Sequence, residues 1–156
     1  MEKYRTEEEQ LSAVKENGLV IRYIVNPSEK VKFTAVKQNG NAIQYIKDPS
    51  EKVQIAAVRQ SGWAIQFINA PSEEVQLEAI EQHPYTIEYI KNPSEKVQIA
   101  AVRQDVWAII FIKNPSEAAL ELYLSNSSYD VSLLKDEWFD GKSAALRLVY
   151  EIKKGI

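Results

Sequence analysis

The amino-acid sequence predicts an all-α fold, namely a short right-handed α-solenoid of about six two-helix repeats closed by a C-terminal capping helix. Five of the six prolines stand 22 residues apart, and each is followed by serine and glutamate. Valine, alanine and isoleucine also recur at fixed places within the same period. Self-similarity at such a period is the signature of units that stack on their neighbours. The prolines that mark the period are Pro27, Pro49, Pro71, Pro93 and Pro115.

The repeats are counted from the glutamate after each Pro-Ser pair, which we number position 1. On this division the chain, 1–156, is a single α-solenoid domain, and its length is sufficient for one core. The units are 7–28, 29–50, 51–72, 73–94, 95–116 and a degenerate 117–138, and the C-terminal cap is 139–156.

Each unit is expected to begin with a first helix of about eleven residues, because apolar residues occupy positions 3, 5, 7 and 8. The serine at position 22 is a preferred N-cap, and the glutamate after it suits the positive end of the helix dipole. Glycine at position 12 is expected to end the helix in the left-handed conformation. These glycines are Gly18, Gly40 and Gly62.

Positions 13–18 predict a second helix of under two turns, ended by the Asn or Asp that precedes the proline. The pattern leaves open whether this helix is α or 3₁₀. Helices this short are marginal alone, so stacking must hold them. Pro84 and Val106 replace the turn glycine, and we therefore expect the repeat geometry to change around the fourth and fifth units.

The two ends are expected to differ from the middle of the stack. Thr6 and Glu9 form a capping-box pattern, and Glu9 stands where later units have valine. At the other end, the segment 143–154 predicts a capping helix that ends at Gly155. One face of this helix carries Ala145, Leu148, Val149 and Ile152.

Composition removes several classes of function. The 19 basic and 22 acidic residues give a net charge of −3, which is too balanced for a basic nucleic-acid binder. No cysteine and one histidine, His83, leave few groups for metal binding or catalysis. We expect no enzyme activity, no catalytic residue, no cofactor and no metal. No apolar run approaches the length of a membrane span, so we expect a cytoplasmic protein with no membrane partner.

A charged stripe is expected on the first helices, because positions 2, 6 and 9 face solvent on a helical wheel. It is basic at both ends and acidic in the fourth unit. A solvated helix face is the plainer interpretation, and a charged groove for a partner is the functional one. The stripe consists of Lys30, Lys37, Lys52, Arg59, Glu74, Glu78, Glu81, Lys96 and Arg103.

Position 13 predicts a row of partly exposed aromatic residues. It holds asparagine in one unit, which a fully buried site would not accept without a partner. Ile110 lies three residues after Trp107 and adds to the same surface. Tryptophan and tyrosine are common interface anchors, although these rings could instead pack on adjacent repeats. The candidate partner-binding residues are Trp63, Tyr85, Trp107, Ile110 and Tyr129.

Position 4 predicts a series of buried amides. It lies within the apolar arc of the first helix, yet it holds Gln54, Gln76 and Gln98. A buried amide needs partners, and the nearest are backbone groups of the Asn-Pro-Ser loops. These glutamines are therefore expected to tie each loop to the adjacent repeat.

The unit 53–68, Val-Gln-Ile-Ala-Ala-Val-Arg-Gln-Ser-Gly-Trp-Ala-Ile-Gln-Phe-Ile, resembles a family of short helical repeats of unknown function in bacterial and phage proteins. The resemblance covers about 7–116. More distantly, the unit is similar to HEAT-type and leucine-rich-variant repeats. These resemblances imply a helical stack and bring no catalytic residue.

The leading hypothesis is a non-enzymatic protein-binding scaffold or inhibitor whose partner is another protein or a second copy of the chain. The resemblance to phage repeats adds a phage-encoded version directed at a host defence protein. One alternative is a nucleic-acid or nucleotide binder that uses the basic part of the stripe and stacks bases on Trp63 and Trp107. Net acidity and three glutamates in mid-stripe weigh against it. The other alternative is a homo-oligomeric structural protein.

Overall fold

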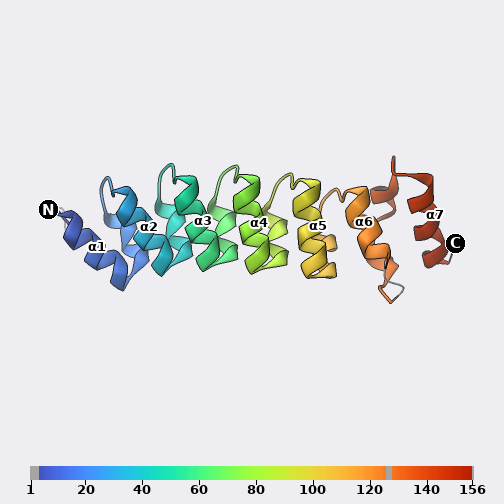
Figure 1. Cartoon of the computed structure of the whole chain (residues 1–156), viewed down its shortest axis with the longest axis horizontal. Helices are drawn as coiled ribbons and strands as arrows, with labels where there is room; N and C mark the ends of the chain where they lie inside the picture. Colours follow the sequence, from blue (N-terminus) through green and yellow to red (C-terminus); the bar gives the residue numbers. More distant parts are fainter. Residues whose placement is uncertain (1–3, 126–127, 156) are drawn as a thin grey trace.

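The computed structural model describes residues 4–125 and 128–155, and this part of the chain contains helices and no strand. Helices and short 3₁₀ helices alternate along an elongated stack (Figure 1). The second element of each regular repeat is therefore a 3₁₀ helix of six residues. In order, the elements are α1 (Glu7–Glu16), η1 (Gly18–Tyr23), α2 (Glu29–Gln38), η2 (Gly40–Tyr45), α3 (Glu51–Gln60), η3 (Gly62–Phe67), α4 (Glu73–Gln82), η4 (Pro84–Tyr89), α5 (Glu95–Gln104), η5 (Val106–Phe111), α6 (Glu117–Leu124), η6 (Val131–Leu133), η7 (Asp136–Phe139) and α7 (Ala144–Lys154).

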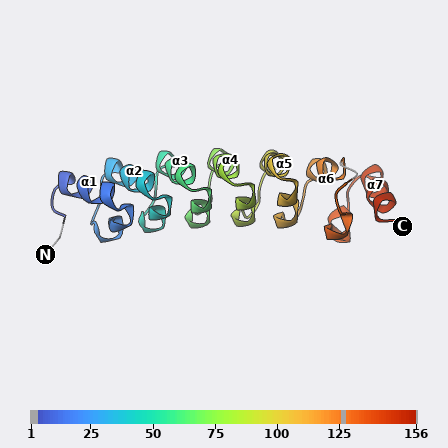
Figure 2. The ribbon, with the colours of Figure 1, turned by 90° about the horizontal axis from the view of Figure 1, so that it is seen from below.

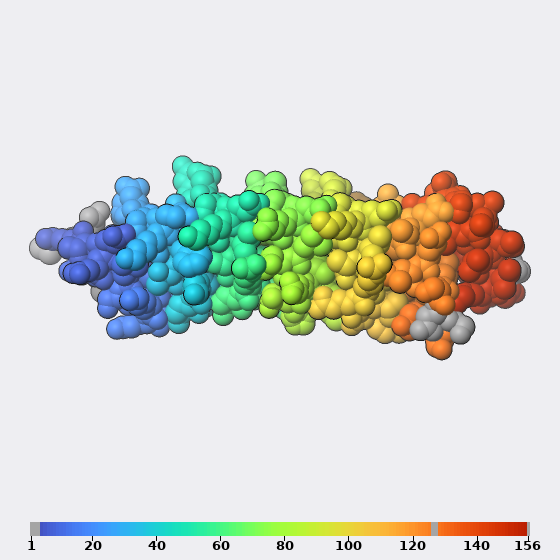
Figure 3. All heavy atoms as spheres, viewed as in Figure 1, coloured from blue at the N-terminus to red at the C-terminus, as the bar shows by residue number. Residues whose placement is uncertain are grey.

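The stack has two layers, with α1 to α6 on one side and η1 to η5 on the other (Figure 2). We call them the α-layer and the η-layer. Each repeat packs on the next, so the repeats follow one another along one continuous body (Figure 3). The core lies between the layers. The α-helices contribute positions 3, 7 and 8, and the η-layer contributes position 15 and the residue that follows each η-element, position 18. In the third repeat these residues are Val53, Ala57, Val58, Ile65 and Ile68. The predicted helical repeat fold is confirmed.

The serine at position 22 is the N-cap of each following α-helix, as predicted. Ser50 accepts a hydrogen bond from the backbone N–H of Val53, and its hydroxyl donates to the carboxylate of Glu29, the first residue of the preceding helix α2. The same pair recurs between Ser94 and Glu73 at 2.6 Å. The glutamate at position 1 therefore interacts favourably with the dipole of its own helix. It also joins the N-termini of consecutive α-helices, a second role that the sequence pattern did not reveal.

The glycines at position 12 were predicted for the wrong reason. The α-helices end on an extended residue such as Asn39, and Gly40 does not have a positive φ. The glycine is required by close approach of the next repeat instead. A Cβ atom on Gly40 would lie 2.5 Å from the carbonyl oxygen of Ala57, and one on Gly18 would lie 2.3 Å from that of Ala35.

Repeat geometry does change at the fourth unit, as the loss of the turn glycine suggested. The N–H of Gly18 donates to Gln38 of the next repeat at 2.7 Å, and a proline at position 84 has no N–H to give. Gln104 keeps only the donation to the preceding helix, to the carbonyl of Glu81 at 3.1 Å, which Gln38 also makes to Glu16 at 3.3 Å. The loop residue before the proline also changes conformation along the stack. Asn26, Asp48 and Ala70 have a positive φ, whereas Asn92 and Asn114 do not.

The backbone of Ala70 is strained, and a substitution is expected to relieve this strain. Its φ of 48° lies in the left-handed region, where Asn and Asp occur more readily than alanine. The equivalent residues of the first two repeats are Asn26 and Asp48. We expect Ala70→Asn to stabilise the protein by about 1 kcal/mol in urea unfolding. An unchanged or lower unfolding midpoint would contradict this.

The glutamines of position 4 bind loop backbone, as predicted, and each of these bonds joins a unit to the loop that ends the preceding unit. Gln54, Gln76 and Gln98 each donate to the carbonyl of the proline five residues earlier, at 2.9, 2.9 and 3.0 Å. Gln98 also accepts from the N–H of Ser116, the N-cap residue of the following helix α6, at 2.7 Å. In contrast, the buried oxygen of Gln76 has no partner.

Because the amides of Gln76 and Gln98 have different partners, their substitution by leucine should lower the free energy of unfolding by different amounts. Gln98→Leu should destabilise the protein by about 2 kcal/mol, because it leaves the loop groups on both sides unpaired. Gln76→Leu should cost less than about 1 kcal/mol, because it also removes an unpaired buried oxygen. Equal losses for the two variants in urea unfolding would show that the bridge to Ser116 contributes nothing.

The C-terminal helix α7 packs by a different face from the one predicted. It buries Leu146 and Tyr150, whereas the predicted face is exposed, with Leu148 56%, Val149 42% and Ile152 66% accessible. The cause is Tyr150, whose ring stacks on Phe139 at 3.9 Å. This aromatic contact therefore decides which face of α7 is buried, and the face with the most apolar residues stays exposed.

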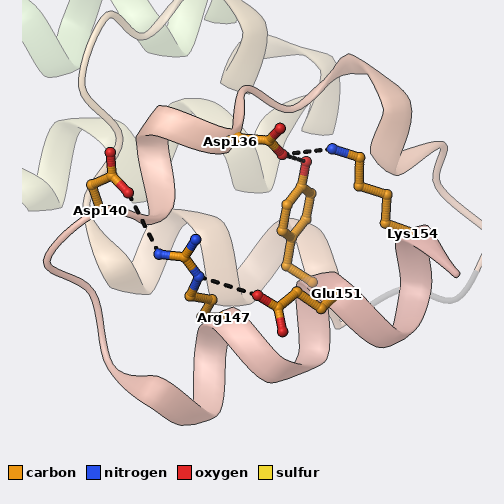
Figure 4. Close-up of polar contacts among 6 residues, drawn as sticks. Asp136, Asp140, Arg147, Glu151 and Lys154 are labelled. Atoms are coloured by element: carbon orange, nitrogen blue, oxygen red, sulfur yellow. Dashed lines mark hydrogen bonds and ion pairs between the residues drawn. The ribbon is translucent and has the colours of Figure 1, made fainter. Parts of the chain in front are cut away.

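Polar contacts hold α7 in this orientation (Figure 4). Asp136 accepts from the hydroxyl of Tyr150 and from Lys154, both at 2.6 Å. These two donors hold the pKa of Asp136 below its ordinary value, Lys154 contributing most. Arg147 bonds Glu151 at 3.2 Å and Asp140 at 3.5 Å. The end of the stack is therefore fixed in place while it presents apolar side chains outward.

Candidate partner-binding surface

The most regular exposed feature of the molecule is an aromatic residue at position 17 of each regular repeat. We call this set the aromatic row. Its members end the 3₁₀ helices of the η-layer, and their accessibilities range from 37% to 62%. The sequence prediction named position 13 and not position 17, although the strict recurrence of aromatics here was a readable signal. The aromatic row is Tyr23, Tyr45, Phe67, Tyr89 and Phe111.

Position 13 lies beside this row and partly supports it. The ring of Trp63 packs edge-on against Tyr89 of the next repeat at 5.9 Å, and Tyr85 lies 5.4 Å from Phe111. Trp63 and Tyr85 are half-buried. Both interpretations of position 13 therefore apply, because these rings pack on the adjacent repeat and also belong to the exposed aromatic surface.

The last predicted residues of this set lie in the fifth and sixth units. Trp107 is 38% accessible and Ile110 is 42% accessible. The ring of Trp107 lies 6.3 Å from that of the half-buried Tyr129 and also 6.3 Å from that of the buried Tyr123. The aromatic surface thus continues from the regular repeats into the degenerate one.

Specific contacts orient individual rings. The hydroxyl of Tyr85 donates to the carboxylate of Asp105, and this hydrogen bond raises the pKa of Tyr85 above its ordinary value. The guanidinium of Arg22 lies over Tyr23 at 4.7 Å and over Tyr45 at 5.8 Å from the ring centroids. The hydrogen bond to Tyr45, together with smaller effects of Tyr23, raises the pKa of Arg22. Arg22 therefore links two members of the aromatic row.

The charged stripe lies on the α-layer, away from the aromatic row. Part of its charge is paired, since Arg59 makes two contacts with Glu78 at 2.5 and 2.8 Å. This pair lowers the pKa of Glu78. Lys96 pairs with Glu73 at 3.0 Å. The predicted stripe is therefore a surface of mixed charge that is partly neutralised by these ion pairs. Its other members are Lys30, Lys37, Lys52, Glu74, Glu81 and Arg103.

An open groove of about 760 Å³ lies on the same layer. Its floor includes Phe33 and Ile55, both half-buried, and its rim includes Lys37 and Lys52. The two ammonium groups lie 5.7 and 5.0 Å from the centroid of Phe33. The lysines therefore cover the apolar floor and reduce what it offers to a partner.

His83 contributes to packing rather than to a recognisable chemical site. Its ring lies 5.1 Å from Trp63 in the adjacent repeat. Within residues 4–125 and 128–155, no three His, Cys, Asp or Glu side chains are grouped as metal ligands would be. In the same described part, no helix has the length and apolar character required to cross a membrane.

Comparison with models of known protein families, with curated proteins and with solved structures found no match to this chain. The coarse prediction of a helical repeat protein is confirmed by the structure alone, and no family match supports the more specific repeat family.

Proposed function

We propose that this chain is a non-enzymatic scaffold that binds a protein partner along the η-layer. The observation that carries the proposal is the aromatic row, in which every regular repeat exposes one large ring at the same position. Aromatic residues are enriched in the energetic centres of protein interfaces. A row of exposed rings along one face is typical of an interaction surface.

The arrangement favours a protein over a nucleic acid as the partner. Stacking tryptophans and phosphate-binding cations would have to face one ligand, as they do in single-strand binders. Here Trp63 and Trp107 belong to η3 and η5, whereas Lys37, Lys52 and Arg59 belong to α2 and α3. Figure 2 shows these elements in two separate layers. The predicted cations Lys37, Lys52 and Arg59 therefore lie in a different layer from the two tryptophans, and the net charge of −3 adds to the case against a phosphate backbone.

The test is capture of the partner from a lysate of the source cell, followed by comparison of variants. We expect Phe67→Ala/Tyr89→Ala/Phe111→Ala to retain at least 10-fold less of the captured protein than the original chain. Its far-ultraviolet circular dichroism should remain helical, since all three rings are exposed.

The matched control changes the other layer. Lys30→Glu/Lys37→Glu should retain the partner to within about two-fold, because rim charges contribute little affinity. Undiminished capture by the aromatic triple variant, with loss in the lysine variant, would place binding on the α-layer and overturn the proposal.

A second candidate function is self-association, which the exposed face of α7 favours. Ala145, Leu148, Val149 and Ile152 have the spacing of one helical face, and an antiparallel pair of such helices is self-complementary. Sedimentation should then show a dimer, and Leu148→Glu/Ile152→Glu should convert it to a monomer. A monomeric original chain at all concentrations would exclude this candidate.

The more specific setting follows from the resemblance of the repeat unit. A cytoplasmic protein, encoded by a phage and directed at a host defence protein, is the version that we propose. Identification of the captured partner as a protein without a defence role would reject this version and leave the scaffold function intact.

A further inference from the structure

We propose that the aromatic row binds an acidic, proline-rich segment in the polyproline II conformation, with one turn of the segment on each repeat. This inference rests on the proposed function, because it names the kind of partner that the same surface fits. Three properties of the surface carry it: the spacing of its rings, the polar groups between them and the row of lysines beside them.

The spacing of the rings admits the pitch of a polyproline II helix. Arg22 lies 4.7 Å from the centroid of Tyr23 and 5.8 Å from that of Tyr45, so these centroids are no farther apart than the sum of those distances. Packed helices generally lie about 8–10 Å apart. A polyproline II helix rises about 3.1 Å per residue with three residues per turn, so the same face returns after about 9 Å. A β-strand returns after two residues, or about 6.7 Å, and would lose register within two repeats.

Polar groups between the rings suit a backbone that has no internal hydrogen bonds. Gln44 and Gln66 each precede a ring by one residue and are exposed. Each side-chain amide donates one hydrogen bond at 2.9 Å to a backbone carbonyl of its own repeat and has a second N–H to donate. Tyr45 and Tyr89 add hydroxyl groups. Polyproline II carbonyls are free to accept hydrogen bonds, whereas those of an α-helix are occupied within the helix. Grooves that recognise such segments combine aromatic rings with donors in this way.

A row of lysines follows the aromatic row two positions later in the sequence. Lys47, Lys91 and Lys113 occupy position 19 and are exposed. Lys91 and Lys113 line a cavity of about 810 Å³ together with Phe111, and Glu88 and Glu137 lie at the same cavity. Cations outnumber carboxylates at position 19, which holds no acidic residue in the regular repeats. Across the regular repeats, positions 16 and 19 hold the cations Arg22, Lys47, Lys91 and Lys113 against one carboxylate, that of Glu88, and this excess favours acidic residues in the segment.

The experiment uses synthetic peptides and fluorescence anisotropy. The first peptide contains six Leu-Pro-Glu triplets, so that one leucine falls on the same face in each turn. The second peptide has the same composition and charge, but its leucines are gathered in one half. We expect the first peptide to bind at least 10-fold more tightly, because only it can place one side chain against each ring.

Two matched triple variants test the charge. Lys47→Glu/Lys91→Glu/Lys113→Glu should weaken binding of the first peptide at least 10-fold, and added salt should weaken binding to the original chain. Lys30→Glu/Lys37→Glu/Lys52→Glu makes the same change of charge on the α-layer and should alter the Kd less than about two-fold.

Equal affinity for the two peptides would overturn the polyproline II assignment. Tighter binding of a helical peptide with leucines at heptad spacing would overturn it too, as would absence of binding by any peptide. None of these results touches the proposed function, which fails separately if the aromatic triple variant still captures the cellular partner.

Discussion

Replacing Gly40 by alanine is expected to lower the free energy of unfolding by about 3 kcal/mol, which is a large effect for the addition of one methyl group. The added Cβ would lie 2.5 Å from the carbonyl oxygen of Ala57 and 2.9 Å from the side-chain oxygen of Gln60. The first of these atoms is backbone of the next repeat. Relief therefore requires the second and third repeats to separate, which disturbs the core between them.

The control for this prediction is Gly141→Ala. Gly141 has a φ of 73° but no atom within 4 Å of the Cβ position. Its substitution should cost only about 1 kcal/mol of backbone strain. Similar losses for the two variants in urea unfolding would mean that repeat contact does not select glycine at position 12.

Tyr123→Ala is expected to destabilise the protein by about 4 kcal/mol, although it restores the alanine found at position 7 of the other repeats. Tyr123 is fully buried, and its ring contacts Trp107 and Tyr129. Its hydroxyl donates to the carbonyl of Asp130 at 2.8 Å. The sixth unit lacks a regular 3₁₀ helix over this position, so alanine would leave a cavity there.

Tyr123→Phe separates the ring from the hydroxyl. It should cost about 1 kcal/mol, because it removes one hydrogen bond and keeps the packing. A neutral or stabilising Tyr123→Ala variant would contradict the packing argument and support a simple consensus rule instead.

The sequence was sufficient for the parts of the fold that depend on local chemistry. Residue type and spacing predict the serine caps, the glutamates of the first turn and the apolar positions of the α-helices. In α3, Ser50 is the N-cap, Glu51 lies in the first turn and Val53 is buried, as predicted. The same holds for the existence of two helical elements in each period.

Contacts between repeats could not be predicted in the same way. The requirement for glycine at position 12 arises from a carbonyl 17 residues later, which no local pattern shows. The face that α7 buries depends on the stacking of Tyr150 on Phe139. The binding prediction placed the exposed aromatic residues at position 13. The exposure of position 17 depends on how the 3₁₀ helix is oriented on the stack, and the length of that helix does not determine its orientation.

Fluorine NMR of the chain labelled with 4-fluorophenylalanine tests the central claim most directly, because its four phenylalanines sample different parts of the molecule. Phe67 and Phe111 belong to the aromatic row, Phe33 to the α-layer and Phe139 to the core. Addition of the purified partner should shift or broaden the signals of Phe67 and Phe111 and leave those of Phe33 and Phe139 unchanged. A change at Phe33 alone would contradict the claim, because the partner would then bind the α-layer.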